Sequence, residues 1–338
     1  MIVSANLRIL TVVLAAVFVT SNLLWSTVIV LGIKPLTLTT PATKIETATA
    51  RPSSSVLLDK FGIEEIYPSK IFEGKEWYLN MNSPSNDTIL SISGGGSETG
   101  SSNVTASNIS KITREADGSW QVHGQRTGGK YDFQVRMRVG TFEDPKWWKN
   151  VEMTGYARII AETSNSSDSA ALDWYARGGN HTSTSPCQGI ALHAGLRVNG
   201  TIYWQKEIWH TGGYTGFRSN VDATHPILGR WIGFKAIIFN IRNDSAVRMQ
   251  TYLDDNATNH WRKVADVADD GGWYADSSDD RFYSANCGRS KDYIVLNSGP
   301  YTTFRSDNMI WDFKDLSVRE IQPPSFTNMT QTHLPRAH

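Results

Sequence analysis

The sequence predicts an all-β protein, an antiparallel β-sandwich that follows an N-terminal transmembrane helix. Three observations lead to this prediction. Several segments alternate apolar and polar residues with period two, clusters of turn residues separate these segments, and one long uncharged run stands near the N-terminus. The 12 Trp, 12 Tyr and 12 Phe residues also favour β-structure, because aromatic side chains pack well on a pleated sheet.

The N-terminal run extends from Ile9 to Ile33 and contains no charged residue. At about 1.5 Å per residue it is long enough to cross a hydrocarbon core of about 30 Å. We therefore expect residues 1–8 to form a short flank and residues 9–33 to be a signal anchor. The chain would then be a single-pass protein of the cell membrane. A cleaved signal peptide, which would make the protein secreted, is the alternative.

Nine Asn-x-Ser/Thr sequons are spread along the rest of the chain. Together they are typical of an exported protein with an N-glycosylated surface, so we expect the main domain to be extracytoplasmic. The sequon residues are Asn86, Asn103, Asn108, Asn165, Asn180, Asn199, Asn243, Asn256 and Asn328.

The two cysteines, Cys187 and Cys287, do not have the spacing of a metal site. In an oxidising compartment we expect one disulfide that closes a loop of about 100 residues, worth up to about 4.7 kcal/mol in the chain-entropy model. Two buried free thiols are the alternative.

Composition divides the chain after the anchor into a stalk, a domain and a tail. Residues 34–55 are rich in Thr, Pro, Ala and Ser, which is typical of an extended stalk. We expect one folded domain at 56–322, with a low-complexity loop at 91–108 inside it. Residues 323–338 are predicted to be a disordered tail.

Within the domain, strict alternation predicts half-buried strands with one face on a core. The clearest runs are residues 131–139, 151–160, 190–198, 232–238 and 247–254. Asn199-Gly200 stands between two alternating runs and predicts a hairpin turn. Many strands without intervening helices favour an antiparallel sandwich or barrel.

The charge balance argues against nucleic acid as a partner. The chain has 33 Lys and Arg and 33 Asp and Glu, so its formal net charge is zero. A nucleic-acid-binding protein needs a surplus of cations to displace counterions from phosphates.

The order of the predicted strands resembles the concanavalin A-like jelly roll of legume lectins, laminin G-like modules, family 16 glucanases and alginate lyases. The resemblance spans roughly residues 61–323. It implies a polysaccharide or glycoconjugate partner on the concave face of one sheet, where exposed Trp and Tyr rings stack on sugars. The segments that carry it are 147–159, 172–180, 189–210, 229–241, 247–255 and 311–321.

The glucanase branch of this superfamily carries carboxylates in an ExDxxE pattern on one strand. Glu115 and Asp117 have the first spacing, but Trp120 stands where the last Glu is needed. Asp117 also precedes a glycine in a predicted turn. A family 16-type glucanase is therefore disfavoured.

The lyase branch needs a group that neutralises a uronate carboxylate and a group that transfers a proton. Gln121 and His123 have the form of the alginate lyase QxH motif, and the resemblance implies these two roles for them. The RTExR and YxKxGxYxQ motifs are absent. From the residues themselves, Arg177 or Gln121 is a candidate for neutralising the carboxylate, and His193, His123 or Tyr203 for the base.

Further polar and aromatic residues are predicted to share strand faces and to bind the ligand. Tyr175 and Arg177 have the spacing of one face, and Tyr203, Gln205, Glu207 and Trp209 form a stripe on another strand. Lys206 falls on the opposite, apolar side of that strand. The candidate ligand-binding residues are Tyr156, Arg158, Tyr175, Arg197, Gln205, Glu207, Trp209, His210 and Tyr214.

Aspartates gather in the predicted turns after residue 253. Carboxylates in loops suit Ca²⁺, which takes 6–8 oxygen ligands, so Asp254, Asp269 and Asp270 are candidates for a structural calcium site. Solvated turn aspartates are the alternative.

Three functions fit these observations. The first is an extracytoplasmic protein that binds polysaccharide without chemistry. The second is a polysaccharide lyase that acts on acidic glycans by β-elimination. The third is a structural cell-surface glycoprotein.

Overall fold

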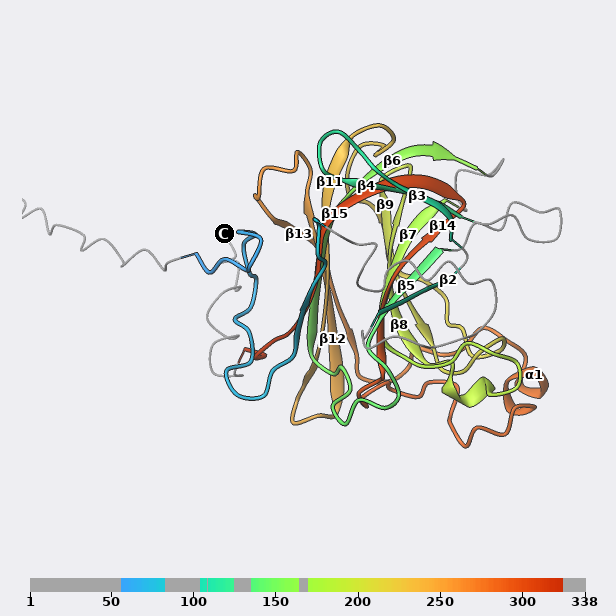
Figure 1. Cartoon of the computed structure of the whole chain (residues 1–338). Coiled ribbons are helices and arrows are strands. Elements are labelled where there is room, and N and C mark those ends of the chain that lie inside the picture. Colours follow the sequence, from blue (N-terminus) through green and yellow to red (C-terminus); the bar gives the residue numbers. More distant parts are fainter. Residues whose placement is uncertain (1–55, 83–103, 108, 125–134, 164–169, 325–338) are drawn as a thin grey trace, which may run out of the picture. The chain divides into compact units, whose positions relative to one another are not determined.

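The computed structural model describes residues 56–82, 104–107, 109–124, 135–163 and 170–324. These residues form two stacked antiparallel sheets with almost no helix, so the predicted all-β sandwich is confirmed (Figure 1). The predicted transmembrane helix at 9–33, the stalk and the tail from residue 325 lie outside the described residues. In the part of the chain that the structure describes, no helix has the length and apolar character needed to span a membrane.

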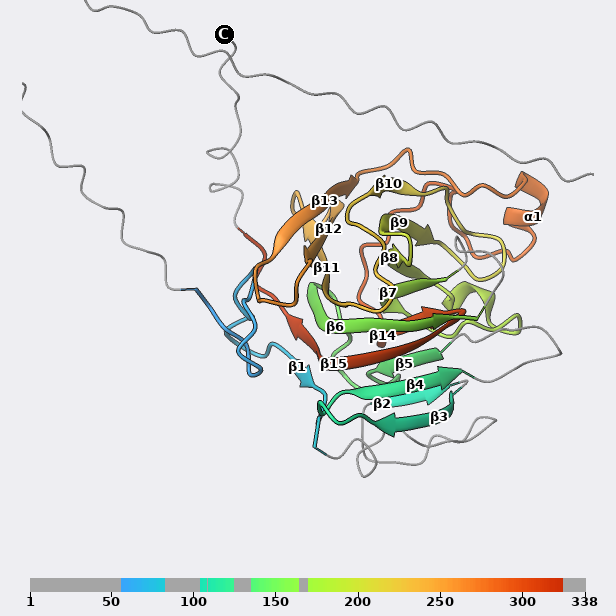
Figure 2. The same ribbon diagram turned by 90° about the horizontal axis from the view of Figure 1, so that it is seen from above.

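The first sheet has eight strands in the order β13-β12-β11-β6-β15-β4-β3, with β1 paired to β15 (Figure 2). Its long central strands β6, β11 and β15 carry most of its pairing. The strands are β1 (Glu76–Tyr78), β3 (Ile109–Arg114), β4 (Trp120–Gly124), β6 (Val151–Glu162), β11 (Trp231–Ile241), β12 (Ala246–Asp254), β13 (Arg262–Asp269) and β15 (Met309–Glu320).

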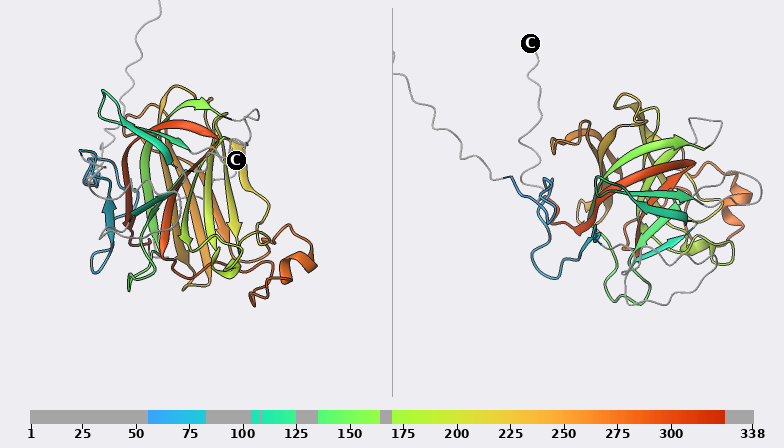
Figure 3. Two further views of the ribbon diagram at one scale, coloured as in Figure 1. Left: turned by 45° about the vertical axis from the view of Figure 1, so that its right-hand side comes forward. Right: turned by 45° about the horizontal axis from the view of Figure 1, so that its top comes forward.

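The second sheet has seven strands in the order β10-β9-β8-β7-β14-β5-β2. A 3₁₀ turn η2 (Pro186–Gln188) and a short helix α1 (Asp279–Tyr283) lie in its loops, and Figure 3 shows α1 projecting beyond the ends of the strands. The strands are β2 (Val104–Ser107), β5 (Val135–Val139), β7 (Ala171–Gly178), β8 (Ala191–Arg197), β9 (Thr201–Glu207), β10 (Arg218–Asp222) and β14 (Tyr301–Asp307).

The structure corrects the low-complexity loop predicted at 91–108. Residues 104–107 form β2, which pairs antiparallel with β5 at the edge of the seven-stranded sheet. The Gly- and Ser-rich composition of this segment does not indicate a strand. β2 pairs with β5, which lies about 30 residues further along the chain. Residues 91–103 and 108 lie outside the described residues.

The core between the two sheets is built around Trp174 of β7. Its ring centroid lies 4.7 Å from that of Phe234 in β11 of the opposite sheet, and 4.8 Å from that of Phe304 in β14. Gly155 of β6 gives the space for this packing. A Cβ atom there would lie 2.3 Å from Leu316 and 3.1 Å from Trp174.

Part of the outer face of the eight-stranded sheet is covered by the chain segment that precedes β1. The buried carboxylate of Glu152 accepts from Lys235 Nζ at 2.8 Å and pairs with the Arg319 guanidinium at 3.1 Å. The backbone amides of Ile66 and Tyr67 also donate to this carboxylate. This network attaches the segment to the sheet, so the protein itself covers this part of the face.

Lys206 of β9 points into the interior, as its position beside apolar residues in the sequence indicates. Its Nζ lies 2.8 Å from Asp269 Oδ2, and both side chains have no exposed surface. The charge of Lys206 is therefore tolerated only because Asp269 neutralises it.

We expect Asp269→Asn to destabilise the protein by about 3–5 kcal/mol, because it leaves the buried Lys206 ammonium without its counter-charge. Asp270→Asn is the matched control, since Asp270 pairs with Arg242 in solvent and such pairs contribute about 0–1 kcal/mol. Urea unfolding of the full chain measures both. Equal destabilisation by the two substitutions would contradict the buried-pair assignment.

Candidate functional site

The outer face of the seven-stranded sheet carries a group of polar side chains that alternates with the core residues. Tyr175 of β7 is paired across the sheet with His193 of β8, and His193 is paired with Gln205 of β9. Asp173 and Glu207 lie on the same face, diagonal to His193. Because Trp174 and Trp204 point into the core, these neighbours must point outward.

His193 is buried at the centre of this face. Its Nδ1 donates to the Asp173 carboxylate at 3.1 Å, and its Nε2 lies 3.5 Å from Glu207 Oε2. Burial disfavours the charged imidazole, but the Asp173 and Glu207 carboxylates outweigh this and raise the pKa of His193 to about 10. The Tyr175 ring stacks on His193 with centroids 4.6 Å apart.

Glu207 lies at the end of β9 and is completely buried. His181 Nε2 lies 2.5 Å from its Oε2, and His210 Nδ1 lies 3.2 Å from its Oε1. Burial raises the pKa of Glu207, but the three neighbouring histidines outweigh burial and hold this pKa well below its usual range. We call His181, His193, His210 and Glu207 the histidine cluster.

The turn after β9 brings Tyr214 back beside Glu207, where the two residues form an isolated β-bridge. Burial and the hydrogen bond to the Glu207 carboxylate both raise the pKa of the Tyr214 hydroxyl. Tyr214 therefore acts as a hydrogen-bond donor to Glu207.

Arg305 of β14 extends the charged network on the other side of Asp173. Its guanidinium lies 3.4 Å from Asp173 Oδ2 and makes a bidentate pair with Asp307. Burial lowers the pKa of Arg305, but the two carboxylates outweigh it and the net pKa is raised. On this side of the face, the charged groups of Asp173, Arg305 and Asp307 are therefore paired with one another.

Tyr203 and Arg197 continue the face toward β10. The Arg197 guanidinium stacks on the Tyr203 ring at 4.4 Å and on the Phe217 ring at 5.0 Å. Gly195 lies beneath Tyr203, because a Cβ atom there would come within 2.0 Å of the ring. A cation and two aromatic rings therefore stand side by side beyond His193.

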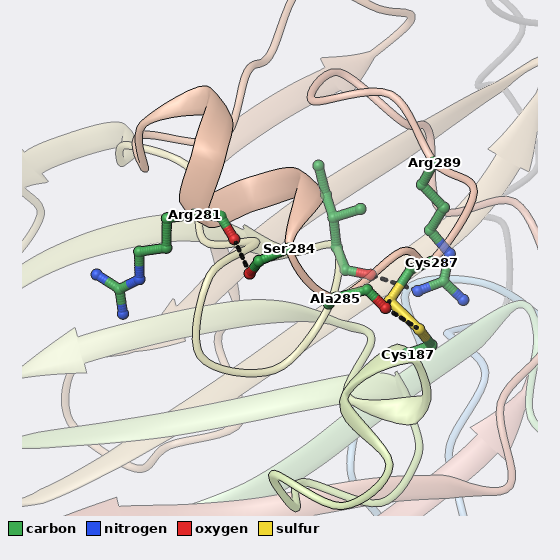
Figure 4. The surroundings of a disulfide bond; sticks show 7 residues. Cys187, Arg281, Ser284, Ala285, Cys287 and Arg289 are labelled. Carbon is green, nitrogen blue, oxygen red and sulfur yellow. Dashed lines mark hydrogen bonds between the residues drawn. A yellow bond between two sulfur atoms is a disulfide. The ribbon is translucent and has the colours of Figure 1, made fainter.

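The loop that carries His181 is held by the predicted disulfide, which is confirmed. Cys187 in η2 is bonded to Cys287, which follows α1, with their Cα atoms 5.3 Å apart (Figure 4). On the same side, Arg289 Nη1 donates to the backbone oxygen of Ile208. The bond thus joins the His181 loop to the segment that packs beside the end of β9.

A pocket of about 270 Å³ opens at the end of this sheet, next to the histidine cluster. The rings of Phe142, Trp147 and Tyr293 line it, together with the side chains of Gln188 and Asn297. We call it the aromatic pocket. Its lining also includes Gly178 and Gly179, and His181 Nδ1 lies 3.1 Å from the Gly179 oxygen. The pocket and the cluster therefore share the chain segment that follows β7.

The structure brings together most of the residues that the sequence predicts for the site. The strand residues among them are on the outer face of the seven-stranded sheet, and the other two come from the loop after β9. These are Tyr175, His193, Arg197, Tyr203, Gln205, Glu207, His210 and Tyr214.

Arg177 does not join this face, although the alternation places it with Tyr175. Its φ of 62° turns the end of β7, and its side chain is completely buried. The guanidinium donates to the backbone oxygens of Lys149 and Val295. Burial lowers its pKa to about 9. The expectation that Arg177 neutralises a carboxylate beside His193 is therefore wrong.

Gln121 and His123 lie on β4, in the other sheet. Gln121 donates to Asp312, and its side-chain oxygen lies 3.0 Å from His123 Nε2. They share the outer face of the eight-stranded sheet and cannot act with His193, from which the core separates them. The catalytic roles that the QxH resemblance implies for them therefore have no support in this arrangement.

Tyr156 and Arg158 belong to the same sheet as Gln121. Tyr156 is buried and donates to Asp254, while Arg158 binds Asp312 at 2.8 Å. The two residues thus lie away from the histidine cluster. Alternation does not determine which sheet a strand joins, and β6, which carries both residues, belongs to the eight-stranded sheet.

Trp209 also leaves the predicted stripe, because β9 ends at Glu207. Its ring is buried in a small cluster with Ile208, Ala275 and Phe282. The structure thus gives Trp209 a packing role rather than a place on the outer face.

The three aspartates expected to bind calcium, Asp254, Asp269 and Asp270, do not lie together at one site. Asp254 accepts from the amides of Thr258 and Asn259, and Asp269 is paired with Lys206. Because β12 and β13 are antiparallel, Asp254 and Asp269 end up at opposite ends of the pair. Asp270 is exposed and pairs with Arg242. These residues therefore form turns and ion pairs and do not share one site.

Four of the predicted sequons are in the described residues. Asn199, Asn243 and Asn256 are exposed in turns, whereas the side chain of Asn180 donates to Gln188. Glycosylation remains a prediction for all nine. Outside the described residues are Asn86, Asn103, Asn108, Asn165 and Asn328.

Sequence reasoning missed His181, Asp173 as a partner of His193, and the three rings of the aromatic pocket. His181 stands in a polar loop without any pattern, and it reaches Glu207 only through the fold. Asp173 is two positions from Tyr175, so alternation predicts that both side chains lie on the same face of the strand. Trp147 precedes a predicted strand, and nothing local shows that it faces a pocket.

No protein-family model and no curated protein matches the chain. Similar solved structures include the family 7 alginate lyase A1-II′ with a product, at 12% identity over 61% of this chain and 82% of that chain, with a TM-score of 0.34. The marine PL-14 alginate lyase from Aplysia kurodai has 9% identity over 62% and 86% and a TM-score of 0.36. Peanut lectin has 9% identity over 75% and 100%, also with a TM-score of 0.36.

Alginate lyases and legume lectins are also groups that the sequence resemblance names. At these identities and TM-scores the likeness carries no conclusion about activity or ligand. The site has to be interpreted from its own residues.

We expect the double substitution Cys187→Ser/Cys287→Ser to lower the free energy of unfolding by up to about 4.7 kcal/mol, because the unfolded chain regains the freedom of a loop of about 100 residues. Urea unfolding of the full chain with and without reductant measures the change. Reductant should destabilise the natural chain and leave the double variant unaffected. Equal sensitivity of both proteins to reductant would contradict this disulfide.

Proposed function

We propose that the protein binds an acidic polysaccharide at the aromatic pocket and along the adjoining outer face of the seven-stranded sheet. The aromatic pocket is the observation that carries this proposal. Concave sites lined by aromatic rings with a few polar groups are typical of ligand binding. Flat rings supply apolar contact to the CH faces of a sugar, and the amides of Gln188 and Asn297 are suited to its hydroxyl groups.

The charge of the lining favours an acidic sugar. Arg289 supplies a cation to the pocket, and the described lining residues include no carboxylate. Arg177 also lines the pocket, but its guanidinium is buried on backbone oxygens. Arg289 also stacks on the Tyr293 ring at 5.3 Å, which holds its cation beside an aromatic surface. A guanidinium matches the geometry of a carboxylate, so a uronate is the monomer that fits best.

The size of the pocket and the length of the face support a polymer. A volume of about 270 Å³ accommodates only a small part of a long glycan. The remaining sugars would extend over the sheet. There the Arg197 cation and the Tyr203 and Phe217 rings form a second aromatic and basic surface. The predicted export of the chain would place this face where polysaccharides occur.

We expect Trp147→Ala to weaken binding of a polyuronate by about tenfold or more, since a buried aromatic contact commonly contributes over about 1.4 kcal/mol. Phe72→Ala is the matched control, because Phe72 is exposed in the segment attached to the other sheet. Affinity electrophoresis in gels containing polyuronate or a neutral glucan measures the effect.

The natural chain should be retarded by the polyuronate more strongly than by the glucan, and the Phe72 variant should behave in the same way. Absence of retardation by either glycan would overturn the proposed function. Equal retardation by both would remove its acidic specificity.

A second candidate, a polysaccharide lyase, is favoured by the Asp173–His193 pair. A histidine with Nδ1 held by a buried carboxylate presents Nε2 in a fixed direction, which is an arrangement suited to proton transfer. Tyr203 remains on the same face as a second proton-transfer candidate. Arg177, Gln121 and His123 have no part in this proposed reaction.

β-Elimination on a polyuronate creates a conjugated double bond that absorbs in the ultraviolet. If the second candidate is correct, the natural chain should produce this absorbance, and His193→Gln should lower the rate by about a hundredfold or more, as expected for loss of a positioned acid–base group. His260→Gln, at an exposed histidine outside the site, should have no effect. No rise in absorbance with any polyuronate would exclude the lyase and leave the binding function standing.

A further inference from the structure

Two histidines and one carboxylate of the histidine cluster converge on a common point. One ligand atom from each of His181, His193 and Glu207 lies within 4.8 Å of the other two. In the described part of the chain, this is the one group of three histidine, cysteine or carboxylate side chains whose ligand atoms lie so close together. The three residues come from the loop after β7, from β8 and from β9, so the sheet itself sets their spacing.

The second nitrogen of each histidine is held in the way that a metal ligand requires. His193 Nδ1 donates to the Asp173 carboxylate, and His181 Nδ1 lies 3.1 Å from the backbone oxygen of Gly179. When an ion binds, Nδ1 keeps its proton and Nε2 releases its own, so that the lone pair of Nε2 is free for the ion. Metal-bound histidines almost always donate their other N–H to a carboxylate or a backbone carbonyl, which orients the ring.

His193 Nε2 provides an independent indication of a ligand. His193 is 1% exposed, and its Nε2 has no hydrogen-bond partner among the described residues. Glu207 Oε2 is 3.5 Å from this nitrogen, which is too long for a good hydrogen bond. A buried polar atom without a partner is costly, and an ion between His193 and Glu207 would remove that cost.

We propose that His181, His193 and Glu207 bind a divalent transition-metal ion, with Zn²⁺ as the best match. Two histidines and one carboxylate are a known ligand set of zinc sites that keep a further coordination position open. Imidazole ligands also select zinc over calcium or magnesium, which prefer oxygen ligands alone. This site is a new function of the outer face, independent of glycan binding in the aromatic pocket.

The distances fit such an ion with one small adjustment. Ligand atoms at about 2.0–2.2 Å from a tetrahedral zinc lie about 3.3 Å from each other. The separation of His193 Nε2 and Glu207 Oε2, 3.5 Å, is already close to this value. His181 Nε2, now 2.5 Å from the same oxygen, has to move back by less than 1 Å, and it is on a loop.

His210 is the most exposed member of the histidine cluster, with 25% of its side chain exposed. His210 Nδ1 and the Tyr214 hydroxyl both bind Glu207, and so they orient the carboxylate. An ion there would use His193 Nε2, the same nitrogen that the lyase candidate uses. Metal binding therefore excludes His193 as the proton-transfer group.

The test uses the full chain with its disulfide intact, freed of metal with EDTA and then titrated with Zn²⁺ and, separately, with Co²⁺. We expect one ion per chain, and Co²⁺ should give the strong visible absorption of a tetrahedral site. His181→Ala and Glu207→Gln should each weaken Zn²⁺ binding by at least about a hundredfold, because each removes a direct ligand. His260→Ala is the control and should bind as the natural chain does.

Asp173→Asn tests whether the Asp173 carboxylate orients His193, and it should weaken Zn²⁺ binding by about 10–100-fold while the Co²⁺ spectrum keeps its tetrahedral form. Thermal unfolding without metal shows whether each variant is folded. A natural chain that binds no Zn²⁺, or that gives no tetrahedral Co²⁺ spectrum, overturns the proposal even if a variant fails to fold. So does binding that is unchanged in folded His181→Ala and Glu207→Gln.

Discussion

The packing of Trp174 between the two sheets is the contact on which the site depends. Its ring fills the space between Phe234 and Phe304, and Gly155 leaves room for it. Once Trp174 points inward, Asp173 and Tyr175 have to point outward, because side chains alternate along a strand. The pairing of β7 with β8 and of β8 with β9 then carries the same orientation to His193 and Glu207. The polar site is thus a consequence of the apolar core on the other side of the same strands.

The buried carboxylates on the two outer faces of the sandwich are paired with different kinds of group. On the eight-stranded sheet, Glu152 is fully matched by Lys235, Arg319 and two backbone amides, and the segment before β1 covers it. On the seven-stranded sheet, the acceptors Asp173 and Glu207 are bound largely by histidines, whose charge depends on protonation or on a bound ion. The first arrangement is suited to stability, whereas the second is suited to exchange of protons or ligands.

The strands and the in-or-out direction of their residues could be predicted from sequence, because alternation is a local property. This applies to Tyr175, His193, Tyr203 and Glu207, and also to the inward direction of Lys206. Alternation does not tell which sheet a strand joins, so Gln121 could not be separated from His193. It also fails where the backbone leaves the regular strand, as at Arg177 with its positive φ. His181 and the aromatic pocket depend on loops positioned by tertiary contacts, which no short-range pattern encodes.

The bond between Cys187 and Cys287 has a consequence for the integrity of the chain. The cysteines are 100 positions apart, and the interval contains all of β8 to β13 together with α1. A single cleavage by a protease anywhere in that interval leaves the two fragments covalently joined. The nicked molecule would migrate as one species until a reducing agent separates its pieces.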